Sequence, residues 1–520
     1  MSEKYTLSRN QYLGIMAALL AVYYLFCGIY LNGLGYFNQE TLFYAEKIKI
    51  ILAGQGYKLK VIGLTSPALP FFSTFLFAAI NPLLAPIIAS CVGTAVLFYL
   101  MGTTLIKKTA NQYYLLLLVI LFLFHPGILY AACSGKSIYM VLIFFYMFFL
   151  NIFKFYTSNT TFHISIASIC LVLLLFCDYK FIWLTLFFIP LIFFIALQTL
   201  NLAEKESIFR MTQSFNNPSL RRKLVSKTFA LYAILFLLPI ASIVCYKMLN
   251  LSNANDADYF MESPYATWTV MAERLTYQKI AWSADFKSQE ISLLITAKVI
   301  MFCPLILFAF YKFRRSNYQL LTLATPFAFV EFLHVKYDKV FLGYQYYLIF
   351  LILTILCLVI KAKPFKSNTV TFKGLLFLML LAQIFTGYLF LKKSFIDDER
   401  NFLTVLIKRV PASKQDESQD MANYINSLSP KSKILLDDAV AYQIVAFTHN
   451  IKSLTLPYQE DYLTAIEAPG KADNYILIAT EKNVLSPYTL LNEEYGPIIY
   501  QSGNMQKVYQ TENWTLYKIL

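Results

Sequence analysis

Long apolar runs separated by short polar gaps recur through most of this chain, and they constrain its fold more than any other feature. Because a bilayer-spanning helix needs roughly 20 apolar residues, residues 1–391 divide into about eleven predicted spans. The chain is 58% hydrophobic and has a mean hydropathy of +0.55, which excludes an ordinary soluble globular protein. We expect an α-helical polytopic membrane protein with spans near 11–31, 84–106, 113–131, 135–153, 162–177, 181–200, 229–248, 291–312, 318–334, 344–361 and 373–391.

The positions of the basic residues orient these spans. The net charge is +14, and the clusters "IKK", "SLRRK", "KFRR" and "IKAKPFK" fall in short gaps between apolar runs. That distribution is typical of cytoplasmic loops, so it argues for a membrane and against a nucleic-acid partner. The polar N-terminus precedes a long apolar run with no small-residue cleavage site, which favours a retained first span over a signal peptide. With the N-terminus inside, the gaps at 107–112, 154–161, 201–228, 312–317 and 361–373 also lie inside, and the C-terminal tail lies outside.

One apolar run, residues 67–82, is ambiguous. It is short and bounded by prolines, and counting it as a full span would place Lys107 and Lys108 outside. We therefore expect a juxtamembrane or re-entrant helix on the outer side.

The tail, residues 392–520, differs from the rest of the chain in composition. An amphipathic helix pattern is followed by the apparent strands "KILLDD", "NYILIAT" and "NWTLYKIL". Alternation of helix and strand patterns predicts a small α/β domain, extracytoplasmic on the orientation above. Asp437 and Asp438 end the first strand, where a turn or a helix cap is the favoured interpretation. No glycine-rich phosphate loop or nucleophile elbow is present.

Metal and disulfide motifs are absent from the sequence. The eight cysteines lie in or beside apolar segments without any CxxC, and the four histidines are far apart. We assign no residue to a metal site and leave open a divalent ion as a cofactor.

The long outer loop 249–290 carries acidic and aromatic side chains. These side chains suit sugar hydroxyls and ring faces, but they suit a solvated loop equally well, and the second interpretation is favoured. The candidates are Asp256, Asp258, Glu262 and Trp268.

The other long outer loop, residues 32–83, begins with "GYFNQETLFYAEKIKIILAGQGY". Asn38 is a plausible N-cap and Gly54 a plausible end, which predicts an amphipathic helix on the outer leaflet. Glu40 lies in its first turn, where the helix dipole favours a carboxylate. Glu40 either completes the cap or serves as a base or ligand at the membrane surface. The predicted apolar face comprises Tyr44, Ile48, Ile51 and Leu52.

This loop resembles the first loop of GT-C glycosyltransferases, which use polyprenyl-phosphate-linked sugars. The similarity is greatest to the protein mannosyltransferase and lipid A aminoarabinose transferase branch. That loop begins with an Asp-Glu pair, continues through an aromatic to a glycine, and ends in a proline-rich turn. Here Gln39 and Glu40 stand at the pair, Phe43 or Tyr44 at the aromatic, "AGQGY" at the glycine turn and "SPALP" at the proline turn. The resemblance covers most of the chain in layout and implies a GT-C-like fold of about eleven transmembrane helices with a small outer α/β domain.

The chain departs from that pattern at Gln39, which stands where the family has an aspartate. An amide cannot accept a proton as a general base does. Either Glu40 takes that role, another acid does, or the chain is not a transferase.

Lysines and tyrosines near the outer surface are candidates for binding the carrier. A polyprenyl-phosphate donor needs cations for its phosphate, although a single interfacial lysine is more often explained by snorkelling. In the resembled family a lysine is common at the place of Lys180, and "YQYYL" is similar to an entry where the family often has an Arg-Tyr pair. The substrate-binding candidates are Gln39, Tyr44, Lys136, Lys180, Lys336, Lys339, Tyr346 and Tyr347.

The resemblance thus implies a membrane glycosyltransferase that moves a sugar from a polyprenyl-phosphate carrier to a lipid or protein acceptor on the outer face. Glu40 is its expected catalytic carboxylate, within a transmembrane domain at 1–391 and an extracytoplasmic domain at 392–520. The alternative is a catalytically inactive relative that serves as a binding or assembly subunit of an envelope complex. A transporter is disfavoured because no internal repeat is visible. We expect a bacterial inner membrane with the C-terminal domain in the periplasm.

Overall fold

The structure is a computed structural model. It describes residues 8–61, 67–199, 216–263, 265–266, 296–314, 317–336, 343–361, 370–394, 396–410, 416–472, 474–483, 485–497 and 504–520.

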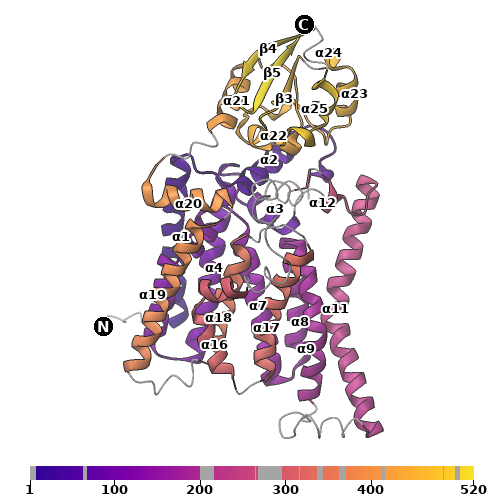
Figure 1. Ribbon diagram of the computed structural model, residues 1–520. Coiled ribbons are helices and arrows are strands. Elements are labelled where there is room, and N and C mark those ends of the chain that lie inside the picture. The colour runs from indigo at the N-terminus through magenta and orange to yellow at the C-terminus, as the bar shows by residue number, and fades with distance from the viewer. Residues whose placement is uncertain are drawn as a thin grey trace, which may run out of the picture.

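A bundle of helices forms the larger part of the molecule (Figure 1). A helix lies in every range predicted to span a membrane. Within the described residues, six helices are long and apolar enough to cross a bilayer, or up to eight if each bent pair counts as one span. The count of about eleven spans stays a prediction. The bundle comprises α1 (Arg9–Gly33), α4 (Ala85–Lys108), α5 (Gln112–Phe124), α6 (Pro126–Cys133), α7 (Ile138–Ser158), α8 (Thr161–Cys177), α9 (Leu184–Thr199), α11 (Pro218–Ala254), α16 (Leu305–Phe313), α17 (Asn317–Lys336), α18 (Gln345–Ile360) and α19 (Val370–Lys392).

Prolines account for two sharp bends in the bundle. The axes of α5 and α6 differ by 62°, and the break falls at His125 and Pro126. The helix Thr296–Phe302 and α16 differ by 102°, with Pro304 at the break. Proline lacks the amide hydrogen that a continuing helix needs, so each helix restarts in a new direction.

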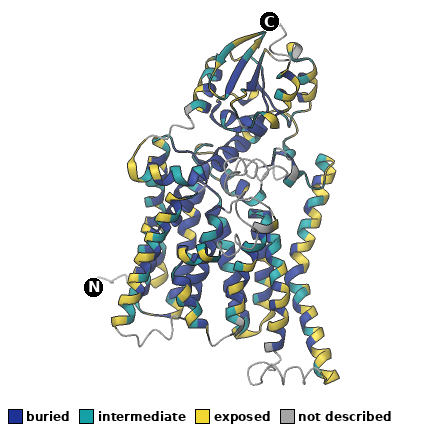
Figure 2. Ribbon diagram, viewed as in Figure 1, coloured by how far each residue is buried: buried dark blue, intermediate teal, exposed yellow. Residues whose placement is uncertain are grey.

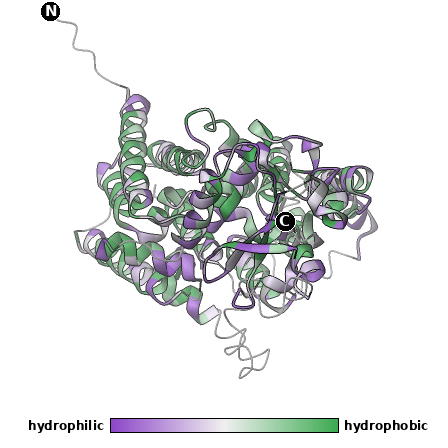
Figure 3. Ribbon diagram, turned by 90° about the horizontal axis from the view of Figure 1, so that it is seen from above, coloured by the Kyte–Doolittle hydropathy of each residue, from purple (hydrophilic) through white to green (hydrophobic). Residues whose placement is uncertain are grey.

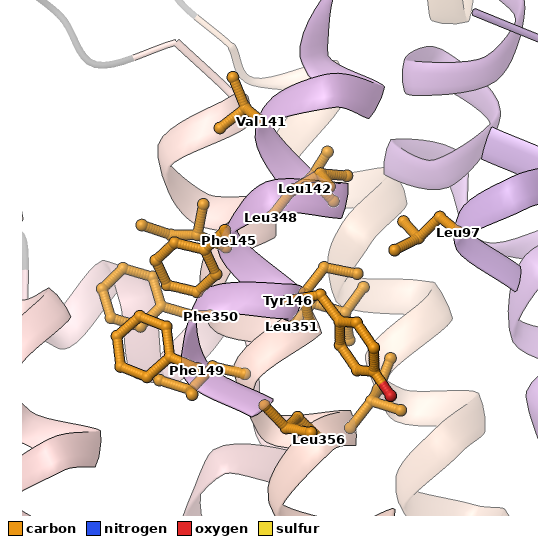
Figure 4. Packing of buried hydrophobic residues seen from close by; sticks show 14 of the residues in the cluster. Leu97, Val141, Leu142, Phe145, Tyr146, Phe149, Leu348, Phe350, Leu351 and Leu356 are labelled. Atoms are coloured by element: carbon orange, nitrogen blue, oxygen red, sulfur yellow. The ribbon is translucent and has the colours of Figure 1, made fainter. Parts of the chain in front are cut away.

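The bundle core is packed with large apolar side chains. Figure 4 shows Phe145 and Phe149 of α7 facing Phe350 of α18, and all three are fully buried. The outward faces are also apolar: 72% of Phe26 and 64% of Leu19, both on α1, are exposed. Figure 2 shows this pattern of a buried interior and exposed outer helices. Large exposed apolar faces on long helices are typical of an integral multi-pass membrane protein.

The first outer loop contains short elements between the bundle and the tail. These are α2 (Gln39–Ala53), the 3₁₀ turn η1 (Lys58–Lys60) and α3 (Ala68–Phe75). The apolar run at 67–82 forms only the eight-residue helix α3 before turning. That length is too short for a span, as predicted.

The predicted bounds of the helix α2 are confirmed, but its predicted amphipathic character is wrong. The Asn38 side chain accepts a hydrogen bond from the Glu40 amide, and Gly54 follows the last helical residue. However, residues 39–48 are all buried, including Glu46 and Lys47. The helix is enclosed because one side packs on the bundle and the other on α22 (Asp438–Phe447) of the tail. It joins two parts of the molecule and has no broad face toward lipid headgroups or solvent.

The tail forms a five-stranded sheet in the order β2-β1-β3-β5-β4. β1 pairs in parallel with β2 and β3, whereas β5 pairs antiparallel with β3 and β4. The three strands expected from the sequence are present, although β1 is only two residues long. The strands are β1 (Ile434–Leu435), β2 (Leu454–Thr455), β3 (Tyr475–Ala479), β4 (Met505–Gln510) and β5 (Trp514–Ile519).

Helices connect the strands of the tail and its sheet to the bundle. α20 lies directly after α19 and packs on α19 and α6, before the sheet begins. In the view from above, the C-terminal domain lies over the bundle (Figure 3). The division of the chain at residue 392 stays a prediction. The remaining elements are α12 (Tyr259–Glu262), η2 (Tyr179–Trp183), α20 (Asp397–Lys408), α21 (Asp416–Ser427), η4 (Ile451–Ser453), α23 (Tyr462–Glu467), α24 (Pro469–Ala472), η5 (Ser486–Tyr488) and α25 (Leu490–Tyr495).

Candidate functional site

Glu40 is held at the first turn of α2 by the cap that precedes it. Asn38 Oδ1 accepts a hydrogen bond from the Glu40 amide at 3.0 Å, and its Nδ2 donates to the Tyr130 hydroxyl of α6 at 3.1 Å. The cap residue therefore fixes the start of α2 against the bundle. Because Glu40 is the second residue of the helix, the same contacts fix its backbone.

Two residues at the start of α7 contact the Glu40 carboxylate. Ser137 Oγ donates to Glu40 Oε1 at 2.5 Å, and the Ser137 amide donates to the same oxygen at 3.3 Å. Lys136 Nζ lies 3.8 Å from Glu40 Oε2. About a tenth of each of the Glu40 and Lys136 side chains is exposed, so neither is sealed in the interior. The structure therefore brings together two of the predicted site residues.

The loop before α7 has a shape that only glycine adopts readily. Gly135 has φ of +77°, in the left-handed region. A Cβ there would lie 2.6 Å from Thr41 Oγ1, and that hydroxyl donates to the Ser134 carbonyl at 2.9 Å. This close approach of α2 to the loop places Lys136 beside Glu40.

A second carboxylate, Glu399 of α20, also lies near Lys136. A Cβ at Gly343 would lie 3.6 Å from Glu399 Oε1 and 3.9 Å from Lys136 Nζ. Glu399 accepts hydrogen bonds from the Tyr344 amide at 2.8 Å and from Ser394 Oγ at 2.5 Å. Burial raises the pKa of Glu399, and Lys136 opposes that rise. Sequence reasoning missed this residue.

Asp398, which sequence reasoning also missed, contacts Gln39, the residue that stands where the resembled family has an aspartate. Its Oδ2 accepts a hydrogen bond from the Gln39 amide at 3.2 Å, and its carbonyl accepts one from the Tyr36 hydroxyl. Gln39 itself is buried. A carboxylate therefore lies at the N-terminus of α2, beside Gln39. This carboxylate is supplied by Asp398 of α20 and not by the residue at position 39.

Lys180 and Tyr346 belong to a neighbouring cluster around Asp178. The Lys180 amide donates to Asp178 Oδ1 at 3.0 Å, and the Tyr346 hydroxyl donates to Oδ2 at 2.6 Å. The Lys180 ammonium lies 5.9 Å from the centre of the Tyr346 ring, and it is attracted by Asp178 and, more weakly, repelled by Lys136. Lys136 and Lys180 are thus two cations available to a phosphate group, each already beside a carboxylate, Glu40 for Lys136 and Asp178 for Lys180.

Three of the other predicted residues make ring or apolar contacts, and one lies outside the described residues. Lys336 lies 4.1 Å from the Trp183 ring centre. Tyr347 packs on Phe302, and Tyr44 is buried in an apolar cluster with Ile48. Lys339 is the one outside the described part of the chain.

The acidic residues that the structure describes in the loop 249–290 do not gather into one site. Asp258 pairs with Lys247 at 2.6 Å, and Asp256 is exposed. Trp268 and the side chain of Glu262 lie outside the described residues. Among residues the structure describes, no group of three or more His, Cys, Asp or Glu side chains fits a metal ion, so we derive no step through a metal.

Comparison with known proteins supports the fold. No protein-family model matches the sequence, and no curated protein matches it. A crystal structure of ArnT from Cupriavidus metallidurans bound to undecaprenyl phosphate is similar over 98% of both chains, with a TM-score of 0.50 and 9% identity. At that identity the likeness shows the fold alone, and it confirms the GT-C-like fold expected from the first-loop resemblance.

Proposed function

We propose that this chain is a membrane glycosyltransferase that moves a sugar from a polyprenyl-phosphate carrier to an acceptor on the side of the C-terminal domain. The observation that carries the proposal is the contact of Glu40 with Lys136 and Ser137, in a site where about a tenth of each charged side chain is exposed. A carboxylate beside an ammonium group, with a second ammonium near the first, provides both a proton acceptor and a phosphate site. The carrier in the ArnT structure supports a carrier of the same class here.

The reaction is a displacement at the anomeric carbon. The acceptor oxygen forms a bond to that carbon while the bond from the carbon to the phosphate oxygen breaks, and the phosphate leaves with the electron pair. Glu40 Oε2 takes the proton from the acceptor. Lys136 and Lys180 stabilise the negative charge that grows on the leaving phosphate.

The Ser137 hydroxyl orients the Glu40 carboxylate by a hydrogen bond. This short hydrogen bond is accepted by Oε1, and the other oxygen, Oε2, faces Lys136. The carboxylate is thereby oriented in the absence of the aspartate that the family has at Gln39. Lys336, Lys339, Tyr44, Tyr346 and Tyr347 stay as predicted carrier contacts.

The test measures release of free polyprenyl phosphate from a panel of polyprenyl-phosphate monosaccharides by the protein in native membranes. Glu40→Gln keeps the shape and removes the proton acceptor, so the release falls at least 100-fold. The matched control is Glu512→Gln, a carboxylate that is 70% exposed in the tail. Equal release by the wild type and Glu40→Gln would remove Glu40 from the mechanism.

The second candidate is a non-catalytic subunit of an envelope complex. The amide at Gln39 favours it, because the family's base is missing at that position. In that case the protein co-purifies with partners at fixed stoichiometry and releases no polyprenyl phosphate from any donor of the panel. Donor turnover that depends on Glu40 excludes this candidate.

A further inference from the structure

An apolar cavity lies in the bundle at the end opposite the C-terminal domain. Its volume is about 80 Å³, several times the roughly 10–15 Å³ that holds one water molecule, and it is partly open to the surface. Almost all of its lining side chains are hydrocarbon, and Tyr114 is the one hydroxyl-bearing member. Five helices contribute to the wall, including Leu105 of α4, Leu118 of α5, Leu305 of α16, Val359 of α18 and Leu376 of α19.

Water is a poor occupant of this cavity. A buried water needs two to four polar partners, and the wall offers at most the Tyr114 hydroxyl. An empty cavity leaves its lining side chains without dispersion contacts, which is unfavourable. Its mouth lies among membrane helices, where hydrocarbon chains are the surrounding solvent. A flexible hydrocarbon chain needs no polar partner, and it restores the dispersion contacts of the lining side chains.

Three lysines lie one helical turn or less beyond the cavity wall, toward the same end of the bundle. Lys108 follows Leu105 by three residues on α4, Lys361 follows Val359 by two after α18, and Lys373 precedes Leu376 by three on α19. At about 1.5 Å per residue, each lysine begins within roughly 5 Å of the wall along the helix axis. The end of α18 and the start of α19 lie at the end of the bundle away from the sheet (Figure 1).

Two of these lysines lie over aromatic rings. Lys373 Nζ lies 5.6 Å from the Tyr113 ring centre, and Lys361 Nζ lies 5.2 Å from that of Phe313. Within the described part of the chain, none of Lys108, Lys361 and Lys373 forms an ion pair with an acidic side chain. The rim of the cavity is therefore positive, and an anionic group complements it.

We propose that this cavity binds one acyl chain of an anionic phospholipid, whose phosphate headgroup contacts Lys108, Lys361 and Lys373. The dry wall selects a hydrocarbon chain, and the three lysines select a negative headgroup. The site lies at the end of the bundle opposite Lys136 and Lys180, so it is separate from the proposed carrier site.

The test uses the full-length protein purified in a neutral detergent, mixed with phosphatidylglycerol or phosphatidylcholine and analysed by native mass spectrometry. The wild type retains phosphatidylglycerol at least fivefold better than phosphatidylcholine. The double variant Lys108→Gln/Lys373→Gln loses that preference. The matched control Arg222→Gln/Lys223→Gln removes the same charge from exposed residues at the start of α11 and keeps the preference.

A second variant separates the chain from the headgroup. Leu118→Trp fills the cavity from α5 and lowers retention of both lipids, while thermal unfolding shows that the protein is folded. Equal retention by the wild type and both site variants overturns the proposal. Displacement of bound phosphatidylglycerol by an equimolar amount of undecaprenyl phosphate also overturns it, because the occupant would then be the carrier's tail.

Discussion

Lys47 Nζ lies 2.9 Å from Asp438 Oδ2, and this ion pair joins α2, which carries Glu40, to α22 of the C-terminal domain. Lys47 also lies 3.2 Å from Glu46 Oε2, and all three side chains are almost fully buried. Buried charges persist only where they are paired. The pair therefore requires the domain to be seated on the bundle.

Replacement of Lys47 by Met is expected to destabilise the protein strongly. The substitution leaves Glu46 and Asp438 buried without their cation, and breaking a buried pair from one side costs about 3–5 kcal/mol. Thermal unfolding in detergent, followed by tryptophan fluorescence, measures the loss. Lys482→Met, at an exposed pair with Glu512, serves as the control and leaves the midpoint unchanged. An unchanged midpoint in Lys47→Met would show that the pair does not join the two parts.

Gly135→Ala is expected to impair the candidate site more than the fold. A non-glycine residue with φ near +77° costs about 1–2 kcal/mol, and the new Cβ meets the Thr41 side chain. The loop shifts and moves Lys136 away from Glu40, so donor turnover falls about tenfold or more while the protein stays folded. In the double variant Gly135→Ala/Thr41→Ala the clash is relieved, and part of the turnover returns. A single variant with wild-type turnover would mean that the loop does not position Lys136.

Lys136→Gln is expected to weaken binding of the carrier phosphate. A hydrogen bond to a charged group contributes about 1.5–3 kcal/mol, which corresponds to roughly 10- to 100-fold in affinity. Binding of undecaprenyl phosphate in detergent measures the change. Lys247→Gln removes a half-buried cation that pairs with Asp258 away from the candidate site, and it leaves the affinity as it is. If both variants bind alike, the phosphate lies elsewhere.

The helices and the cap of α2 could be predicted from the sequence because their causes are local. Apolar runs set the helices, and Asn38 and Gly54 lie within a few residues of the ends that they form. The burial of α2 could not be predicted in this way. Glu46 and Lys47 indicate a polar face by composition, but Lys47 pairs with a residue 391 positions later.

Only part of the candidate site could be predicted from the sequence, because its other part depends on contacts between distant segments. Glu40 and Lys136 were identified from residue type and from the resemblance of the loop, and the structure places them together. Glu399 and Asp398 follow a late span with no motif around them. Their relation to Lys136 and Gln39 depends on the packing of α20 against the bundle, which is a contact across some 360 residues for Asp398. The acidic run "IDDER" after an apolar span was the one signal available.

Asp437→Asn is expected to change how stability depends on pH. Burial and the neighbouring Asp438 raise the pKa of Asp437 to about 7, whereas its ordinary value is about 3.9. Between about pH 4 and pH 7 the folded state therefore binds more protons than the unfolded state, so stability falls as the pH rises through that window. Asparagine carries no charge and is an equally good helix cap for α22, where Asp437 accepts a bond from the Ala439 amide. The variant is therefore more stable than the wild type above pH 7, and the difference shrinks toward pH 4. Thermal midpoints measured from pH 4 to pH 8 in one detergent test this, and parallel curves for the two proteins would contradict it.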